Sequence, residues 1–172
     1  ASLELDERSG EFSSGAVQIG NPIEEKKVLD LVLTARDKEL FGAITDCGGG
    51  GLSSAVGEMA ARTGCEVWLD KVPLKYPGLS PAEIWVSEAQ ERMVVFVEPG
   101  KVPELLQLAK ENDVEATIIG KVTGTKRLVL KYRERIVADL PMRFLHHGWR
   151  QVKRVARWER QDIPEPFVPH RR

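Results

Sequence analysis

The sequence ITDCGGGGLSSAVGEM, residues 44–59, decides how the rest of this chain is interpreted. It predicts a buried strand that ends at the acidic Asp46, followed by a bend and then an amphipathic helix. Glycine has no Cβ and adopts positive φ readily, so a run of glycines lets backbone N–H groups approach a bulky ligand. The bend consists of four consecutive glycines: Gly48, Gly49, Gly50 and Gly51.

This glycine bend has two interpretations that the residues alone leave open. The N-terminus of the following helix offers unpaired amides and the positive end of its dipole, which favour a phosphate or carboxylate. Asp46 adds a carboxylate, and Mg²⁺ is commonly held by one or two carboxylates together with substrate oxygens. A glycine-rich bend can equally serve only to pack a helix close to a sheet. The bend is neither a Walker loop nor the dinucleotide fingerprint.

Composition limits the class of protein. A chain of 172 residues with 42% hydrophobic residues suits one globular domain with a sizeable core. We find no signal-peptide pattern and no apolar run of membrane-spanning length, so we expect no membrane partner. The formal net charge of −1 argues against a general nucleic-acid binder. Cys47 and Cys65 have no metal-ligand spacing, so we expect a reducing, cytoplasmic location.

The chain divides into three parts by composition. Residues 1–14 are polar and are expected to form an extended N-terminal segment, while residues 15–148 contain the periodic helices and strands. Residues 149–172 hold seven Lys or Arg against three Asp or Glu and several prolines, which predicts a basic tail or linker. The fold class predicted for the central part is α+β, with a mixed sheet layered with helices.

Local signals place most elements. Asn21 and Ser80 are predicted N-caps, each followed by proline at the first helical position, and Glu83 completes a capping box with Ser80. Helices are expected from residue 22, after the glycines, from residue 81 and over 99–112. Strands are expected over 41–45, 65–70, 94–97 and 116–120, and a hairpin over 128–132 and 135–140.

A second polar cluster, Ser87 to Met93, precedes the apolar strand at 94–97. Charged residues at the entrance to a buried strand are costly unless they are paired or bound to a ligand. Either a Glu91–Arg92 ion network caps the sheet there, or the cluster contacts a ligand. His146 and His147 lack a third ligand at suitable spacing and are expected to be surface residues.

Several motifs in the same order resemble a known family. GAVQIGNP, ITDCGGGGLSSAVGEMA, LSPAEIWVSEAQERM, IGKVT and VADLPM together look like the C-terminal-type domain of phosphoribosylformylglycinamidine synthase, or formylglycinamide ribonucleotide amidotransferase. The resemblance covers most of residues 12–147. It implies the fold of the C-terminal domain of aminoimidazole ribonucleotide synthetase and its relatives.

The resemblance also implies an activity. Enzymes of this family are purine-biosynthetic, ATP-dependent ligases that convert formylglycinamide ribonucleotide, with ammonia from glutamine, to the amidine. Carried over position by position, Gln18 matches a substrate-contacting glutamine and Asp46 a magnesium ligand. Glu88, Ala89 and Gln90 match a substrate-binding segment. Mg²⁺ and ATP are the implied cofactor and co-substrate.

The resemblance has departures and missing parts. Ala89 stands where serine is commoner, which removes a hydroxyl contact, and the glycine run is fuller than the usual Gly-Ala-Gly-Gly. The catalytic histidine and most nucleotide ligands of the family would lie in an N-terminal ATP-binding domain, so no residue here is expected to be catalytic. The other implied partners are glutaminase and small accessory subunits or domains. We therefore expect a substrate-binding part of a longer enzyme, inactive alone.

Two other functions remain open from the sequence. One is a domain of another ATP-dependent enzyme of the same superfamily that acts on a different phosphorylated compound. The other is a noncatalytic regulatory module that keeps the fold without the site.

Overall fold

The computed structural model describes residues 20–75, 77–149 and 152–159, and its strands form two sheets. The smaller sheet pairs β1 (Ala43–Asp46) with β3 (Met93–Phe96) in antiparallel orientation. The larger sheet has the order β4-β2-β5-β6, in which β2 runs parallel to β5 and the other pairs are antiparallel. This mixed architecture confirms the predicted α+β class.

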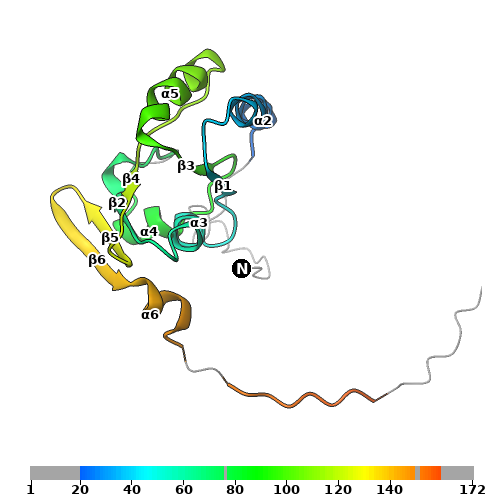
Figure 1. The fold of residues 1–172 in the computed structure, drawn as a ribbon, viewed down its shortest axis with the longest axis vertical. Coiled ribbons are helices and arrows are strands. Elements are labelled where there is room, and N and C mark those ends of the chain that lie inside the picture. Colours follow the sequence, from blue (N-terminus) through cyan, green and yellow to red (C-terminus); the bar gives the residue numbers. More distant parts are fainter. Residues whose placement is uncertain (1–19, 76, 150–151, 160–172) are drawn as a thin grey trace, which may run out of the picture.

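The elements follow one another as Figure 1 shows. The remaining strands are β2 (Cys65–Trp68), β4 (Gly120–Val122), β5 (Arg127–Tyr132) and β6 (Arg135–Pro141). The α-helices are α2 (Pro22–Asp37), α3 (Leu52–Met59), α4 (Pro81–Val86), α5 (Val102–Glu111) and α6 (Met142–His147). Two 3-10 turns, Leu69–Lys71 and Pro99–Lys101, follow β2 and precede α5.

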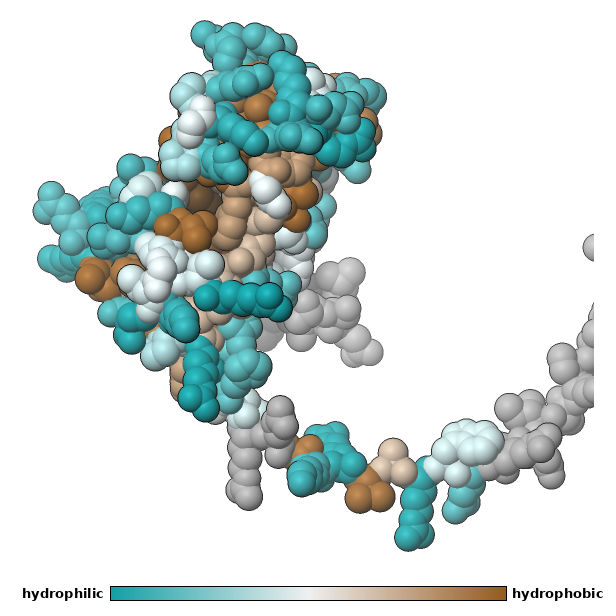
Figure 2. All heavy atoms as spheres, in the orientation of Figure 1, coloured by the Kyte–Doolittle hydropathy of each residue, from teal (hydrophilic) through white to brown (hydrophobic). Residues whose placement is uncertain are grey.

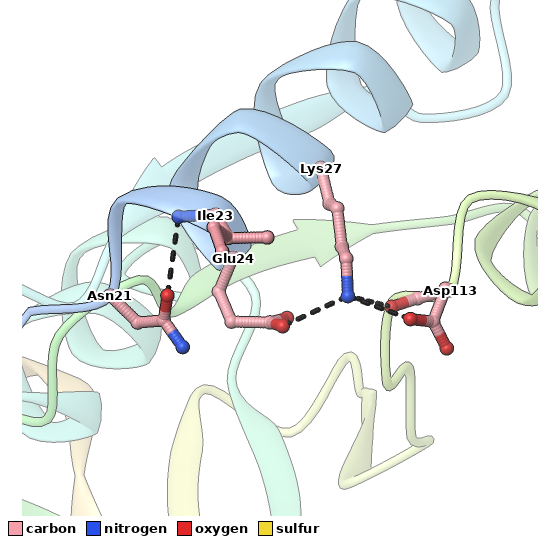
Figure 3. A network of polar contacts seen from close by, with 5 residues as sticks. All are labelled: Asn21, Ile23, Glu24, Lys27 and Asp113. Atoms are coloured by element: carbon pink, nitrogen blue, oxygen red, sulfur yellow. Dashed lines mark hydrogen bonds and ion pairs between the residues drawn. The ribbon is translucent and has the colours of Figure 1, made fainter.

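The helix starts and the hairpin confirm the local predictions. The side chain of Asn21 accepts a hydrogen bond from the Ile23 amide at 3.2 Å (Figure 3). Ser80 and Glu83 form both hydrogen bonds of the predicted capping box. The two strands β5 and β6 turn at residues 133–134 as expected. These features depend on residues close together in sequence, which is why short patterns were enough.

The main core lies between the larger sheet and helices α3, α4 and α6. Its fully buried members include Leu69, Ile84 and Met142, each at most 2% exposed. Cys65 and Val67 of β2 also point into it. Both cysteines of the chain are buried and free.

A second, smaller core joins α2 to α5, which lie side by side in Figure 1. Leu31 and Ala35 of α2 pack there with Leu108 and Ala109 of α5. At its edge, Lys27 pairs with Glu24 at 3.0 Å and with Asp113 at 2.7 Å (Figure 3). We call this part of the molecule the α2–α5 lobe.

Two strand predictions were wrong in detail. The strand expected over 116–120 forms instead at Gly120–Val122, where it pairs with β2. The backbone of Gly120 lies so close to the Glu66 carbonyl that a Cβ would overlap it, a tertiary contact invisible in local propensity. The strand after the second polar cluster is not buried on both faces, because its sheet has only two strands and only Val94 in it is buried.

The basic part of the tail that the structure describes, residues 152–159, is neither helix nor strand and extends away from the domain (Figure 1). Its apolar and charged side chains are both exposed, as the alternating colours in Figure 2 show. The rest of the predicted tail and the predicted N-terminal segment 1–14 lie outside the described residues. Among the described helices, none has the length and apolar character needed to cross a bilayer.

Candidate functional site

Antiparallel pairing of β1 with β3 brings the glycine bend and the second polar cluster to the same place. Asp46, the last residue of β1, is opposite Met93, the first residue of β3. The pairing continues beyond the strands, since the Cys47 amide donates to the Arg92 carbonyl at 3.0 Å. The chain therefore leaves β1 through the glycines directly beside the segment by which it enters β3.

The glycine bend is a tight turn held by its own backbone. The Gly51 amide donates to the Gly48 carbonyl at 2.9 Å, and both Gly50 and Gly51 have positive φ, at 82° and 56°. Gly51 lies against the backbone of Ser87 so closely that any Cβ would overlap the Ser87 carbonyl. Here glycine is needed both for conformation and for close approach.

One amide of the bend already has an anionic acceptor. The Gly50 N–H donates to the Glu88 carboxylate at 3.0 Å. Among the described residues, the amides of Gly48 and Gly49 have no hydrogen-bond acceptor. The bend thus donates one hydrogen bond to Glu88 and leaves two of its amides without an acceptor among the described residues.

The predicted Glu91–Arg92 ion network is absent from the ion pairs of the described residues. Glu91 instead pairs with Lys75 at 3.1 Å and accepts a hydrogen bond from the Asn21 amide at 2.7 Å. The Arg92 guanidinium donates to the Ser87 carbonyl. Sequence reasoning did not find Lys75, because its only signal is an ordinary exposed lysine 16 residues away.

Two carboxylates at this site have no ion-pair partner among the described residues. Asp46 is exposed, and one of its oxygens lies 2.7 Å from the position that a Cβ on Gly48 would take. Glu88 is the second carboxylate. This uncompensated negative charge beside free amides suits a divalent cation that bridges to an anionic ligand. The described residues contain no cluster of three metal-ligating side chains, so Mg²⁺ held here would complete its shell with ligand oxygens and water.

The remaining predicted site residues differ in placement. Ala89 is buried and Gln90 is exposed, on the segment that follows Ser87. Gln18 lies outside the described residues. A hollow of about 290 Å³ lies at the opposite end of β1, beside Gly42 and Lys101, and holds none of the predicted ligands.

Burial explains the behaviour of the thiols near the site. Burial raises the pKa of Cys47, the residue between Asp46 and the glycines, while the nearby Arg92 opposes that shift. Burial also raises the pKa of Cys65 to about 11. Both thiols stay protonated at neutral pH, so neither has the character of a nucleophile. His146 is exposed, as predicted for both histidines, and its Nε2 lies 3.1 Å from the Gly57 carbonyl oxygen.

Comparison with known proteins identifies the family of this chain. The family described as "AIR synthase related protein, C-terminal domain" matches residues 1–133. The chain belongs to this family. Within it, the chain is a domain of the type found in PurL, the phosphoribosylformylglycinamidine synthase subunit. It is 42% identical over 147 residues to PurL of Staphylococcus haemolyticus, and 37% identical over 176 residues to PurL of Methanopyrus kandleri.

These AIR synthase related relatives are much longer than the chain. The two alignments cover 84% and 96% of the chain but only 20% and 24% of the relatives. Solved structures agree: PurL of Thermotoga maritima complexed with FGAR has a TM-score of 0.77 and 31% identity, and covers 86% of this chain and 25% of its own. The PurLQS structure from the same organism also has a TM-score of 0.77, at 30% identity, covering 92% of this chain and 27% of its own.

Proposed function

We propose that this chain supplies part of the substrate and Mg-phosphate site of an ATP-dependent ligase that converts formylglycinamide ribonucleotide, with glutamine-derived ammonia, to formylglycinamidine ribonucleotide. The single observation that carries this proposal is the hydrogen bond from the Gly50 amide to the Glu88 carboxylate. It joins two motifs, 38 residues apart, that the resemblance assigns to metal and substrate binding.

Within this proposal each residue has a defined role. Asp46 would hold Mg²⁺, which offsets the charge of phosphate groups and orients them. The free amides of Gly48 and Gly49 would donate to an anionic oxygen. Glu88, Ala89 and Gln90 would contact the substrate, with Ala89 contributing only its backbone because its side chain is a methyl group, and Gln18 would complete the contact from the residues before α2.

The rest of the proposed enzyme lies in partners. An N-terminal ATP-binding domain of the same protein would supply ATP and the catalytic histidine, while glutaminase and small accessory subunits or domains would supply ammonia. The Thermotoga maritima PurL–FGAR and PurLQS structures described above support this assembly by similarity, as does a structure of the same PurL complexed with ATP. The chain alone is then expected to form no amidine, and the assembly is expected to be cytoplasmic.

Substitution of Asp46 by asparagine tests the metal role. The isolated chain is titrated with formylglycinamide ribonucleotide at several Mg²⁺ concentrations, using isothermal titration calorimetry. We expect the Mg²⁺-dependent part of the affinity to fall at least about tenfold in Asp46→Asn, since a neutral amide is a poorer ligand for a hard cation. The free energy of unfolding is expected to change by less than about 0.5 kcal/mol, because Asp46 is exposed.

Asp30→Asn is the matched control, because it removes an exposed carboxylate of α2 that pairs only with Lys26 among the described residues. It is expected to bind as the unchanged chain does. Equal Mg²⁺ dependence in Asp46→Asn and the unchanged chain would favour a noncatalytic module. Tighter binding of another phosphorylated metabolite would instead favour a different enzyme of the superfamily.

A further inference from the structure

Arg92 is a charged residue of the site to which the proposed function gives no role. Its guanidinium Nε is buried and has no hydrogen-bond partner, and no carboxylate pairs with it among the described residues. The two nearest acidic residues in sequence are engaged elsewhere, Glu88 with Gly50 and Glu91 with Lys75. Arg92 as a whole is half-buried, and even partial burial of a cation without a counter-charge has a free-energy cost.

The contacts of Arg92 connect the two motifs of the site. Its backbone carbonyl accepts from the Cys47 amide at the start of the glycine bend. Its guanidinium Nη2 donates to the carbonyl of Ser87, five residues earlier. Arg92 therefore links the start of β3 to the glycine bend through its backbone, and to Ser87, at the start of the second polar cluster, through its side chain.

The Ser87 carbonyl is the point where these contacts converge. The same oxygen lies against the backbone of Gly51, in the space that a Cβ would occupy. The Ser87 carbonyl is thus in contact with both the backbone of Gly51 and the Arg92 guanidinium. The next residue is Glu88, whose carboxylate accepts from the Gly50 amide.

We infer that Arg92 is a positioning residue, whose guanidinium fixes the Ser87 carbonyl against the glycine bend so that Glu88 and Gln90 are presented to the ligand. This inference deepens the proposed function and rests on it for the identity of the ligand. Arginine suits the task because its planar, rigid guanidinium donates in fixed directions, whereas the lysine ammonium is a flexible point charge.

The test measures the position of Glu88 without any ligand. Amide hydrogen exchange followed by NMR reports the hydrogen bond of the Gly50 N–H to Glu88, and the Leu130 amide in β5 reports the stability of the main core. We expect Arg92→Met to speed exchange at Gly50 by at least about tenfold relative to Leu130, because a charge-assisted hydrogen bond loses its support. Arg92→Lys is expected to restore only part of the protection.

Arg36→Met is the matched control, because Arg36 is an exposed arginine of α2 that pairs with Asp37. It should leave the ratio of exchange rates at Gly50 and Leu130 unchanged. Unchanged protection of Gly50 in Arg92→Met would overturn the inference. An equal loss of protection at Gly50 and Leu130 would also overturn it, because that result indicates a general loss of stability. Full restoration by Arg92→Lys would overturn it as well, because any positive charge would then be sufficient.

Ligand titration keeps this inference separate from the proposed function. If formylglycinamide ribonucleotide and Mg²⁺ fail to bind the unchanged chain, the proposed function is wrong while the exchange ratio still decides the role of Arg92. If they bind, Arg92→Met is expected to weaken binding at least about tenfold through the displaced segment, and unchanged affinity would contradict the inference.

Discussion

The candidate site and the α2–α5 lobe are held together in different ways. At the site, backbone lies against backbone: Gly51 against Ser87, and the Cys47 amide on the Arg92 carbonyl. In the lobe, two helices share a few apolar side chains and an exposed ion pair between Lys27 and Asp113. Figure 2 shows mainly hydrophilic side chains over this lobe. The contrast predicts that the contact of Gly51 with Ser87 tolerates no added side chain, whereas the exposed ion pair of the lobe can be replaced at little cost.

The largest expected effect comes from adding one methyl group at the site. Gly51→Ala places a Cβ in the volume of the Ser87 carbonyl and keeps a positive φ of 56°. We expect a loss of about 3 kcal/mol in the free energy of unfolding, from overlap and backbone strain together. Urea unfolding followed by circular dichroism measures it.

Gly49→Ala is the control within the same bend, because no atom lies within 4 Å of a Cβ built there. It is expected to change the free energy of unfolding by less than about 0.5 kcal/mol. Similar losses of stability at the two positions would show that the close contact between Gly51 and Ser87 does not limit substitution in the bend.

An intermediate effect is expected at high pH in the main core that supports the site. Burial raises the pKa of the Cys65 thiol to about 11, above its value in the unfolded chain. The protonated thiol therefore contributes stability below pH 8.5 or so, and that contribution is lost as the pH rises toward about 11. The free energy of unfolding of the unchanged chain should fall more steeply than that of Cys65→Ala over this range. Parallel curves for the two proteins would contradict this assignment.

The smallest effect is expected in the lobe. A hydrogen bond from Lys27 lowers the pKa of Asp113, and the same contact raises the pKa of Lys27. The pair therefore stabilises the folded chain at pH values between the unperturbed pKa values of aspartate and lysine. Its contribution is lost as the pH falls through the lowered pKa of Asp113. Lys27→Gln should lower the midpoint of thermal unfolding only slightly at pH 7, and the difference should shrink as the pH falls through the lowered pKa of Asp113. A difference at pH 7 as large as that of Gly51→Ala would remove the contrast between lobe and site.

The sequence predicted the parts of the fold that depend on neighbouring residues. Asn21, Ser80 and the turn at 133–134 carry their own signals, because a cap or a tight turn is completed within four residues. The strand at Gly120–Val122 was misplaced because its pairing with β2 depends on close approach to residues far away in sequence. The separation of the strands into two sheets has the same cause.

For the candidate site, the sequence indicated which motifs matter but not how they meet. The predicted partners Glu91 and Arg92 are adjacent in sequence, yet the structure separates their side chains. Glu91 has a positive φ of 58°, and its carboxylate turns to Lys75 and Asn21. Which partners the Glu91 carboxylate contacts depends on backbone positions far away in sequence, so local sequence patterns do not predict it. Gln18 stays a prediction.

The carboxylate of Glu91 connects the candidate site to the start of helix α2. One oxygen accepts from the Asn21 amide, at the first turn of α2, and the other pairs with Lys75. Glu91, the neighbour of Gln90 in sequence, is thereby bound to the N-terminus of α2, a helix of 16 residues. Movement of residues 88–90 would therefore shift the start of α2, so a fluorophore attached at the exposed Ile23 would report such a movement.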